Sequence, residues 1–401
     1  MSDILFLCQR LPYPPDKGEK IRAFHLLRHL AERHRVFLGC FVDDSRDWQY
    51  VDELTSLCTT SYFQGLNPTW ATICSATGFL TRRPLSTTYY ENRRLKRWVA
   101  QIVNEYKPKV AVIYSSVMAQ YLTGHLSQFA NVVIDFVDVD SDKWRQYAKR
   151  KQWPMSWIYH REARRLLAYD RRWAQAVSAA TFVSQPEAEL FRHHAPEVAD
   201  KIHVIANGVD SSYFAPDIVA PMEDGSPYPR VVLTGTMNYW PNEDAAIWFA
   251  KDIWPKIRRH YANAQFIIVG ARPSRSVQAL GNADDIEVTG RVDDIRPYLA
   301  AADVVVAPMR IARGVQNKIL EGMAVGKPVV TTPQGLEGID ARSGEHLVVA
   351  EGADLFAEAI LQCLQPPMAQ RLGQAGRQLI LENYDWPSKL AAFDALLDIK
   401  T

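Results

Sequence analysis

Short apolar runs alternate with amphipathic stretches along most of the chain. The first run covers residues 4–8, a helical pattern follows from about residue 20 to 34, and a second run covers residues 35–42. Later runs recur at residues 110–114, 132–137, 180–184, 230–235, 265–270, 285–290 and 304–306. Strands that alternate with helices in this way predict doubly wound parallel sheets, so the expected fold class is α/β.

The chain is too long for one hydrophobic core. It has 401 residues, and two domains of about 200 residues each are the natural division. Residues 211–229 contain four prolines and no periodicity, which is typical of an interdomain linker. We therefore expect an N-terminal domain at 1–210 and a C-terminal domain at 230–383, followed by an amphipathic helix at 384–401.

Composition indicates an ordinary folded protein. The net charge of +1 does not select any class of charged partner, and the five cysteines show no metal-ligand spacing, which favours reduced thiols. No apolar stretch approaches the roughly 18 residues of a transmembrane helix. The apolar run at residues 4–7 is too short for a signal peptide and does not follow a basic region. The expected location is the cytoplasm, or the inner face of the membrane as a peripheral protein.

The most informative segment is residues 303–332, which predicts a strand, a loop, a helix opening near Gln316 and a second strand. Such a loop places cations and unpaired backbone N–H groups at a helix N-terminus, where the helix dipole favours an anion such as a diphosphate. The cations are Arg313 and Lys318. Glu321 lies on the same helical face as Lys318 and can accept hydrogen bonds from hydroxyls beside that anion. This pattern suggests a nucleotide-diphosphate ligand.

The run LEGMAVGKPVV, residues 320–330, resembles the donor-binding motif of retaining glycosyltransferases of family 4. The resemblance implies the GT-B fold, in which two Rossmann-like domains face a central cleft. It also implies an N-terminal acceptor domain, a C-terminal nucleotide-sugar donor domain, and a last helix that packs back on the first. The second glutamate of the family's motif falls on Glu321, as the ribose ligand. The first falls on position 313, where this chain has Arg313.

Other donor-site candidates follow predicted strands, because ligands of open α/β sheets bind beyond the carboxyl ends of the strands. Together with Glu321, the expected donor-binding residues are Gly314, Val315, Gln316, Asn317, Gly235, Thr236, Asn238, Arg291 and Val292. Many members of the family carry an arginine and a lysine after the first strand of this domain, and both are missing here. Arg313 and Lys318 are therefore the candidates for neutralising the leaving diphosphate. The alternative is that both are solvated loop charges.

The N-terminal domain offers fewer candidates. Its first loop resembles the glycine loop of the family, so Lys17 and Gly18 are candidates for contacting a phosphate of the donor or acceptor; Lys17 is equally well explained as a surface lysine. Asp138 lies where many relatives place an active-site histidine. It is the candidate for orienting sugar hydroxyls or stabilising positive charge, and the alternative is a helix N-cap. In this family the departing diphosphate is thought to take the acceptor proton, and no metal is expected, although residues 138–140 weakly match a metal motif.

Two segments carry an excess of positive charge. Residues 143–173 contain ten Lys or Arg against two acids, with four tryptophans among them, and residues 82–97 add further cations. Such segments suit an anionic membrane surface or a lipid-linked diphosphate acceptor. The alternative is a helix with a solvated basic face and tryptophans in the core. No nucleic-acid-binding motif accompanies the segments, so nucleic acid is not an expected partner.

These features predict a retaining, hexosyl-type glycosyltransferase that moves a sugar from a nucleotide-diphosphate sugar to a lipid-linked glycan acceptor without a cofactor. The runs PYPPDKGEKIR and DFVDVDSDKW, together with the donor motif, look most like the exosortase-associated (PEP-CTERM system) sugar transferases of bacteria, which implies exopolysaccharide biosynthesis. Two alternatives remain open. One is a non-catalytic nucleotide-sugar-binding or scaffold component of a polysaccharide assembly complex; the other is a GT-B nucleotide-sugar epimerase. A NAD-dependent oxidoreductase is disfavoured because no GxGxxG follows the first strand.

Overall fold

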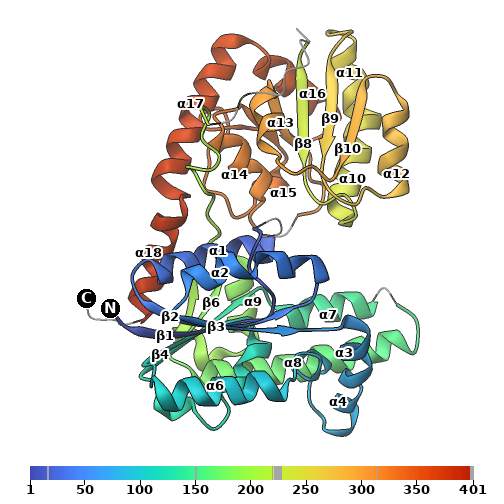
Figure 1. Ribbon diagram of the computed structural model, residues 1–401. Coiled ribbons are helices and arrows are strands. Elements are labelled where there is room, and N and C mark those ends of the chain that lie inside the picture. Colours follow the sequence, from blue (N-terminus) through green and yellow to red (C-terminus); the bar gives the residue numbers. More distant parts are fainter. Residues whose placement is uncertain (16–17, 150, 219, 221–227, 313, 398–401) are drawn as a thin grey trace. The chain divides into compact units, whose positions relative to one another are not determined.

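The computed structural model describes residues 1–15, 18–149, 151–218, 220, 228–312 and 314–397. These residues form two compact units (Figure 1). Unit 1 comprises residues 1–206 and the chain from residue 390, and unit 2 comprises residues 207–389. The predicted linker at 211–229 falls at the start of unit 2, and its residues 219 and 221–227 lie outside the described part of the chain.

Unit 1 is built on a seven-stranded parallel sheet with the order β3-β2-β1-β4-β5-β6-β7. Its strands are β1 (Asp3–Cys8), β2 (Arg35–Val42), β3 (Thr60–Gly65), β4 (Val110–Tyr114), β5 (Asn131–Val137), β6 (Ala179–Phe182) and β7 (Ile202–Val204). All five residues of β4 are buried. A strand covered on both faces reads as a continuous apolar run, which is why the central strands were readable from the sequence.

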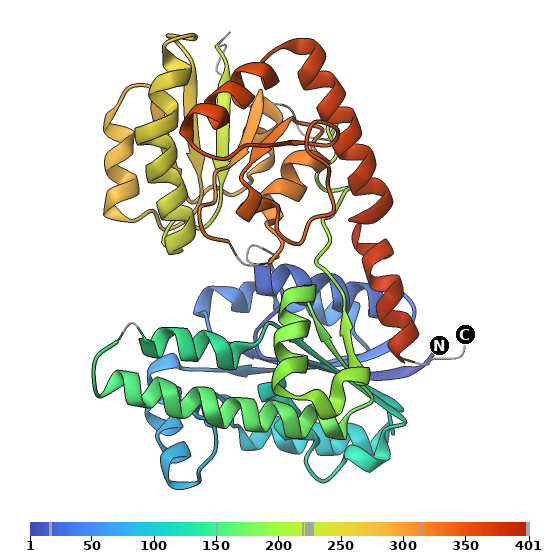
Figure 2. The ribbon, with the colours of Figure 1, turned by 180° about the vertical axis from the view of Figure 1, so that it is seen from behind.

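Helices cover both faces of this sheet, with α1 and α2 on one side and α6 and α8 on the other (Figures 1 and 2). The helices of unit 1 are α1 (Gly18–Ala31), α2 (Val51–Leu57), α3 (Pro68–Ser75), α4 (Thr77–Leu80), α5 (Leu85–Tyr89), α6 (Arg93–Glu105), α7 (Asp140–Lys149), α8 (Met155–Ala176) and α9 (Gln185–His194). Helix α6 shows the local logic. The Asn92 side chain accepts hydrogen bonds from two backbone N–H groups of its first turn, and Leu95, Val99 and Ile102 form its buried stripe.

Unit 2 is built on a six-stranded parallel sheet with the order β10-β9-β8-β11-β12-β13. Its strands are β8 (Arg230–Thr234), β9 (Gln265–Val269), β10 (Ile286–Gly290), β11 (Val304–Ala307), β12 (Val329–Thr331) and β13 (Val348–Val349). Its helices are α10 (Trp240–Trp248), α11 (Trp254–Arg258), α12 (Arg275–Gln278), α13 (Arg296–Ala301), α14 (Asn317–Ala324), α15 (Pro333–Leu336), α16 (Ala353–Cys363) and α17 (Pro366–Asn383).

The last helix, α18 (Trp386–Leu397), starts in unit 2 and ends in unit 1. In unit 1 the carboxylate of Asp394 lies 2.8 Å from Nε2 of His29 on α1. Asn131 donates a hydrogen bond of 2.8 Å to the carbonyl of Leu396. These polar contacts, together with buried Phe393 and Leu397, fix the end of the chain on the first sheet. Among the residues described, no helix has the length and apolar character needed to cross a bilayer.

Several element bounds differ from the sequence-based expectation for local reasons. Helix α1 ends at Ala31 rather than 34, because residues 32–34 form the turn into β2. Strand β6 ends at Phe182 rather than 184, because the Ser184 side chain caps α9 by accepting from the N–H of Glu187. Strands β3 and β13 were not predicted. Both lie at sheet edges and are only half-buried, so neither produces a continuous apolar run.

Candidate functional site

In the sheet of unit 2 the strand order reverses between β8 and β11. These two strands are neighbours in the sheet although they are three strands apart in sequence. In open α/β sheets the loops at the carboxyl ends of such a pair flank the usual ligand site. The loop after β8 starts at Gly235, and the loop after β11 leads to Gln316 and α14. Both loops contain residues expected to bind the donor, so the strand order and the predicted motif indicate the same candidate site.

Three glycines bring the carboxyl ends of β8, β9 and β10 close together. Gly235 donates a hydrogen bond of 3.0 Å to the carbonyl of Val269, and Gly270 donates one of 3.2 Å to the carbonyl of Gly290. A Cβ at Gly270 would overlap the backbone of Gly235, and a Cβ at Gly235 would lie 2.7 Å from the Asn242 amide nitrogen. Side chains are therefore excluded at Gly235 and Gly270, and the glycines let the strand ends pack closely.

Lys318, in the first turn of α14, is 7% exposed and is held by side-chain amides of α10 and of the α14 N-cap. Its ammonium donates to the side-chain oxygen of Asn242 at 3.0 Å and to that of Gln316 at 3.3 Å. Asn242, from α10, in turn donates to the carbonyl of Thr236 at 3.1 Å. Asn242 thus joins the two predicted loops. The sequence analysis missed it, because nothing in its helical setting distinguishes it from a solvent-facing asparagine.

The charges of Lys318 and Glu321 are both perturbed. Burial lowers the pKa of Lys318 to about 8, and the neighbouring Glu321 carboxylate opposes this change. Desolvation raises the pKa of Glu321 to about 7, with Lys318 opposing it. Two ionisable groups that carry their charge at a desolvation cost are a mark of binding and catalytic sites, because a ligand of matching charge removes the cost.

The N-terminus of α14 presents further polar groups beside Lys318. Gln316 is the N-cap residue, but its side chain does not cap the helix and instead donates to the carbonyl of Gly314 at 3.1 Å. The side-chain oxygen of Asn317 is buried and has no hydrogen-bond partner within the described ranges. The positive end of the α14 dipole therefore lies beside Lys318, an arrangement that suits an anion.

The residues around α14 hold this arrangement rigid. The hydroxyls of Thr331 and Thr332, at the end of β12, donate to the carbonyls of Ala307 and Met309 at 2.9 and 2.6 Å. A Cβ at Gly322 would lie 3.0 Å from the Val305 side chain, so a glycine lets α14 sit directly on β11. These contacts explain why small residues and threonines accompany the polar residues of the motif.

The structure leaves some predicted donor residues at the periphery of the site. Asn238 is exposed in the turn after β8, and Arg291 is exposed after β10. Val292 packs with the core on one face of the sheet, and Val315 packs near Gly338. Arg313, the predicted diphosphate ligand, lies outside the described residues.

The residues predicted to act from the N-terminal domain lie in unit 1, whereas the donor motif lies in unit 2. Asp138 follows β5, and its carboxylate is 2.8 Å from the ammonium of Lys143, which also lies 3.0 Å from Asp140. Although burial opposes it, these two carboxylates raise the pKa of Lys143. Gly18 is the first residue of α1, and Lys17 is outside the described residues. The 138–140 pair thus surrounds a lysine in this structure, and within the described ranges no cluster of three or more metal-ligating side chains occurs.

Parts of the chain are similar in sequence to known glycosyltransferases. Residues 228–366 match the family model described as "Glycosyl transferases group 1". The chain is 28% identical over 248 residues, 57% of its length, to a GDP-mannose-dependent α-(1-6)-phosphatidylinositol monomannoside mannosyltransferase of Mycolicibacterium smegmatis. It is 34% identical over 126 residues, 29% of its length, to the lipopolysaccharide core biosynthesis glycosyltransferase LpsE of Rhizobium meliloti. These matches span 64% and 36% of the relatives' own lengths.

The whole chain also resembles solved structures. It superimposes on Anabaena HepE, solved in complex with UDP and glucose, with a TM-score of 0.66 over 99% of each chain at 15% identity. At this identity the likeness concerns the fold. The two parallel-sheet units and this neighbour confirm the predicted α/β class and the GT-B fold. The family match itself falls on the part of the chain that contains Lys318, Glu321 and Gly235.

Proposed function

We propose that the protein is a retaining glycosyltransferase that transfers a sugar from a nucleotide-diphosphate sugar to a lipid-linked glycan acceptor. The observation that carries the proposal is the candidate anion site of unit 2, in which a buried lysine, a helix N-terminus without a side-chain cap and glycine-lined strand ends meet. The names of the mannosyltransferase and LpsE relatives, and of the UDP-bound neighbour, support this activity.

The chemistry follows from where charge develops. As the bond between the sugar's anomeric carbon and the diphosphate oxygen breaks, negative charge grows on the diphosphate. The Lys318 ammonium and the N–H groups of α14 are already oriented and partly desolvated, so they stabilise this charge without reorganising. The departing diphosphate oxygen takes the proton of the acceptor hydroxyl as that hydroxyl bonds to the anomeric carbon on the same face. No side chain then needs to act as the base.

Glu321 and the loop glycines would position the donor for this step. Glu321 lies one turn into α14 from the anion site, where its carboxylate can accept hydrogen bonds from ribose hydroxyls. Asp138 of unit 1 remains a candidate for contacting the sugar. We further propose a role in exopolysaccharide biosynthesis, on the resemblance to exosortase-associated transferases, and action at the inner face of the membrane without a bound metal.

The test is binding of UDP, GDP, ADP and their common sugars by calorimetry, with and without magnesium. One diphosphate should bind at micromolar affinity without magnesium, and Glu321→Ala should abolish that binding while the fold stays intact. Glu358→Ala is the matched control, because Glu358 is an exposed glutamate on α16 of the same unit and should bind like wild type. Wild-type affinity in Glu321→Ala would remove the ribose assignment.

Turnover of the bound nucleotide sugar separates the proposal from its alternatives. Release of free sugar or its transfer to a glycolipid extract supports the transferase. Release of an altered nucleotide sugar without any acceptor would indicate an epimerase. Binding with no turnover under either condition would indicate a scaffold or sensing component.

A further inference from the structure

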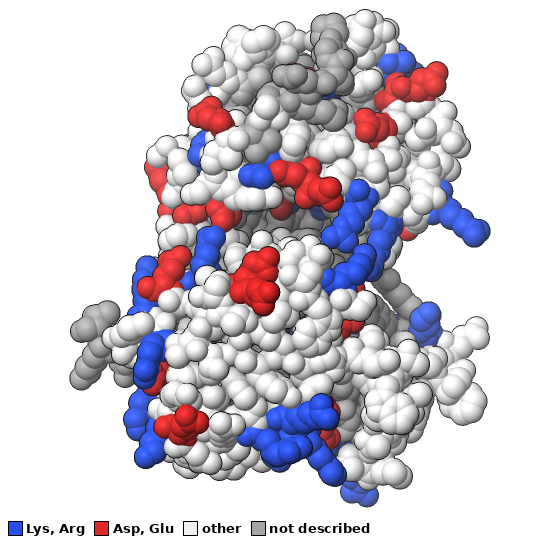
Figure 3. Space-filling view, in the orientation of Figure 1, with Lys and Arg blue, Asp and Glu red and all other residues white. Residues whose placement is uncertain are grey.

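Unit 1 contains a basic cavity that the donor chemistry does not use. It has a volume of about 460 Å³ and lies between α6, α8 and the turn that precedes α5. Six cationic side chains line it, namely Arg82, Arg83, Arg93, Lys96, Arg165 and Arg172. Lys and Arg side chains gather over α6 on the face shown in Figure 3. Glu91 is the only acidic lining residue that the structure describes, so the lining is strongly positive.

Most of these cations have no carboxylate to neutralise them. Arg83 forms an ion pair with Glu91 at 2.8 Å, and Arg172 lies over the ring of Tyr169 at 5.8 Å. The other four form no ion pair with any residue that the structure describes, and they converge on one cavity from three elements. Like charges held this close repel each other unless an anion lies between them. The cavity is therefore suited to a phosphate group, which also offers several acceptor oxygens to arginine.

Buried contacts fix the shape of the cavity. Glu162 on α8 accepts hydrogen bonds from the N–H groups of Leu85 and Ser86 at 2.7 and 2.9 Å and so caps α5. Its neighbour Arg161 donates to the carbonyl of Gly78 at 2.5 Å. Both α8 residues are buried. The turn between Gly78 and Leu85 includes Arg82, which has a left-handed backbone conformation with φ of 56°. Such strain in a non-glycine residue persists only where the surrounding contacts enforce it.

Exposed apolar side chains lie near the turn that carries the lining residue Arg82. Leu80, at the end of α4, is 88% exposed and precedes Arg82 by two residues. Phe79 stacks on Trp157 of α8, with ring centroids 5.9 Å apart, and Trp157 remains 54% exposed. Aromatic and leucine side chains beside cations are the combination that binds at a lipid interface.

We propose that this cavity binds the phosphate of an anionic phospholipid while the apolar side chains beside it enter the lipid. The charge of the lining matches that headgroup, and the neighbouring tryptophan and leucine distinguish a lipid from a soluble phosphate compound. The inference deepens the membrane location within the proposed function. It is independent of the donor site, because no residue of the cavity belongs to unit 2.

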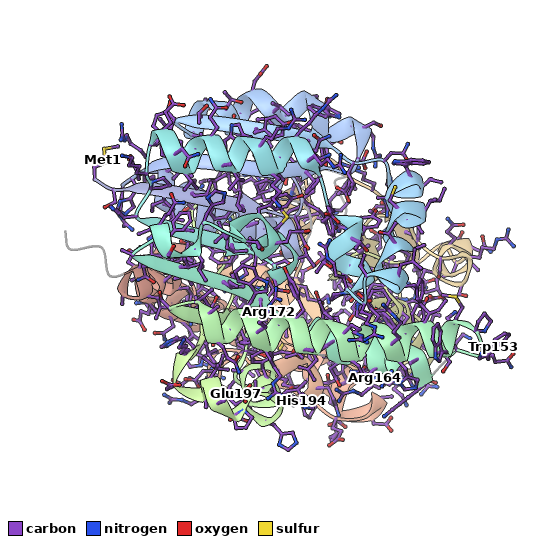
Figure 4. All side chains as sticks on the ribbon, turned by 90° about the horizontal axis from the view of Figure 1, so that it is seen from below. Met1, Trp153, Arg164, Arg172, His194 and Glu197 are labelled. Atoms are coloured by element: carbon purple, nitrogen blue, oxygen red, sulfur yellow. The ribbon has the colours of Figure 1, made fainter. Side chains whose placement is uncertain are left out.

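The experiment is flotation of the full chain with phosphatidylcholine vesicles that contain or lack phosphatidylglycerol. The key variant is Arg165→Glu, and Arg164→Glu is its matched control. Both residues are exposed on α8 and both changes alter the net charge equally, but only Arg165 lines the cavity. Successive helix residues point about 100° apart, so Arg164 and Arg165 point in different directions, and Arg164 is not a lining residue. Figure 4 shows α8 lengthwise with Arg164 and Arg172 on it.

Binding that requires phosphatidylglycerol, falls roughly tenfold in Arg165→Glu and stays near wild type in Arg164→Glu supports the proposal. Equal losses in the two variants would show diffuse attraction and overturn the cavity assignment. Absence of vesicle binding, with calorimetric binding of inorganic pyrophosphate that Arg165→Glu removes, would assign the cavity to a soluble phosphate and overturn the lipid. Nucleotide binding measured on the same samples should be unchanged. If the wild-type protein bound no nucleotide, that result would count against the proposed transferase and not against the cavity.

Discussion

The two positively charged regions of this protein differ mainly in how far their charges are removed from water. In unit 2 a single lysine, Lys318, is 7% exposed and is oriented by two side-chain amides. In unit 1 six cations surround a cavity, and most of them are exposed on helix and turn surfaces. Electrostatic interactions are much stronger and less screened in a low-dielectric site than at a surface. One buried charge can therefore stabilise charge that develops in a chemical step. The exposed cations are each screened, so several of them must act together to bind an anion.

The largest effect is expected from removing the buried charge. Lys318→Met should lower kcat for the nucleotide sugar identified by calorimetry by about 10²–10³-fold, because one preorganised donor to the developing anion is lost. The melting temperature should change little, since the loss of a desolvated charge offsets the loss of the hydrogen bond to Asn242. Turnover assays with a thermal melt as a folding control measure both. A kcat within threefold of wild type would return Lys318 to a structural role.

The perturbed pKa of Lys318 sharpens the contrast through pH. Because its pKa is lowered to about 8 by burial, the ammonium is present below that pH and is lost above it. Diphosphate affinity should then fall as pH rises beyond about 8, by up to about tenfold per pH unit. Titration of the dissociation constant from neutral to alkaline pH checks this. Lys318→Met should show no alkaline decline, and a wild-type profile that is equally flat would contradict the assignment.

Salt should separate the two regions by a smaller factor. Raising the ionic strength from low to above-physiological values should weaken vesicle binding at the unit 1 cavity roughly fivefold, because exposed charges are screened over about 8–10 Å. Nucleotide binding at the buried site of unit 2 should change by less than about twofold. Flotation and calorimetry in the same salt series provide the comparison. Equal salt dependence at the two sites would mean that burial of Lys318 does not set its behaviour.

The sequence predicted the unit 2 site better than the unit 1 cavity, and the reason is the range of the contacts. The loop after β11 and the first turn of α14 are contiguous in sequence, so Gln316, Lys318 and Glu321 could be recognised together. Asn242 could not, because its contact with Lys318 joins residues 76 positions apart. A polar residue on a helix gives no periodic signal for such a contact.

The cavity of unit 1 shows the same limit more strongly. The two basic segments, 82–97 and 143–173, were visible as an excess of charge. Their convergence was not, because it depends on Arg161 and Glu162 binding the turn before α5 from more than 75 residues away. The fold class was predictable because buried parallel strands give continuous apolar runs. Which polar side chains converge is set by packing that a linear pattern does not contain.

Unit 1 also contains a buried ionisable group, Asp170, and it tests whether burial alone explains the lowered pKa of Lys318. Asp170 is buried and accepts a hydrogen bond of 2.6 Å from Ser116, and desolvation raises its pKa to about 8. The folded state therefore binds more protons than the unfolded state between the ordinary pKa and about 8. Stability from this group is present at low pH and is lost as pH rises through that window.

Asp170→Asn keeps an acceptor for Ser116 but cannot ionise, so it should be destabilised little at pH 5 and should exceed wild type in stability at pH 9. The difference should amount to roughly 1–3 kcal/mol, since each unit of pKa change corresponds to about 1.4 kcal/mol. Thermal melts of both proteins across this pH range measure it, and Asp200→Asn, near the surface of the same unit, is the control. A pH-independent difference would show that the pKa of Asp170 is not raised into this range. Burial in this fold would then not by itself account for the lowered pKa of Lys318 at the donor site.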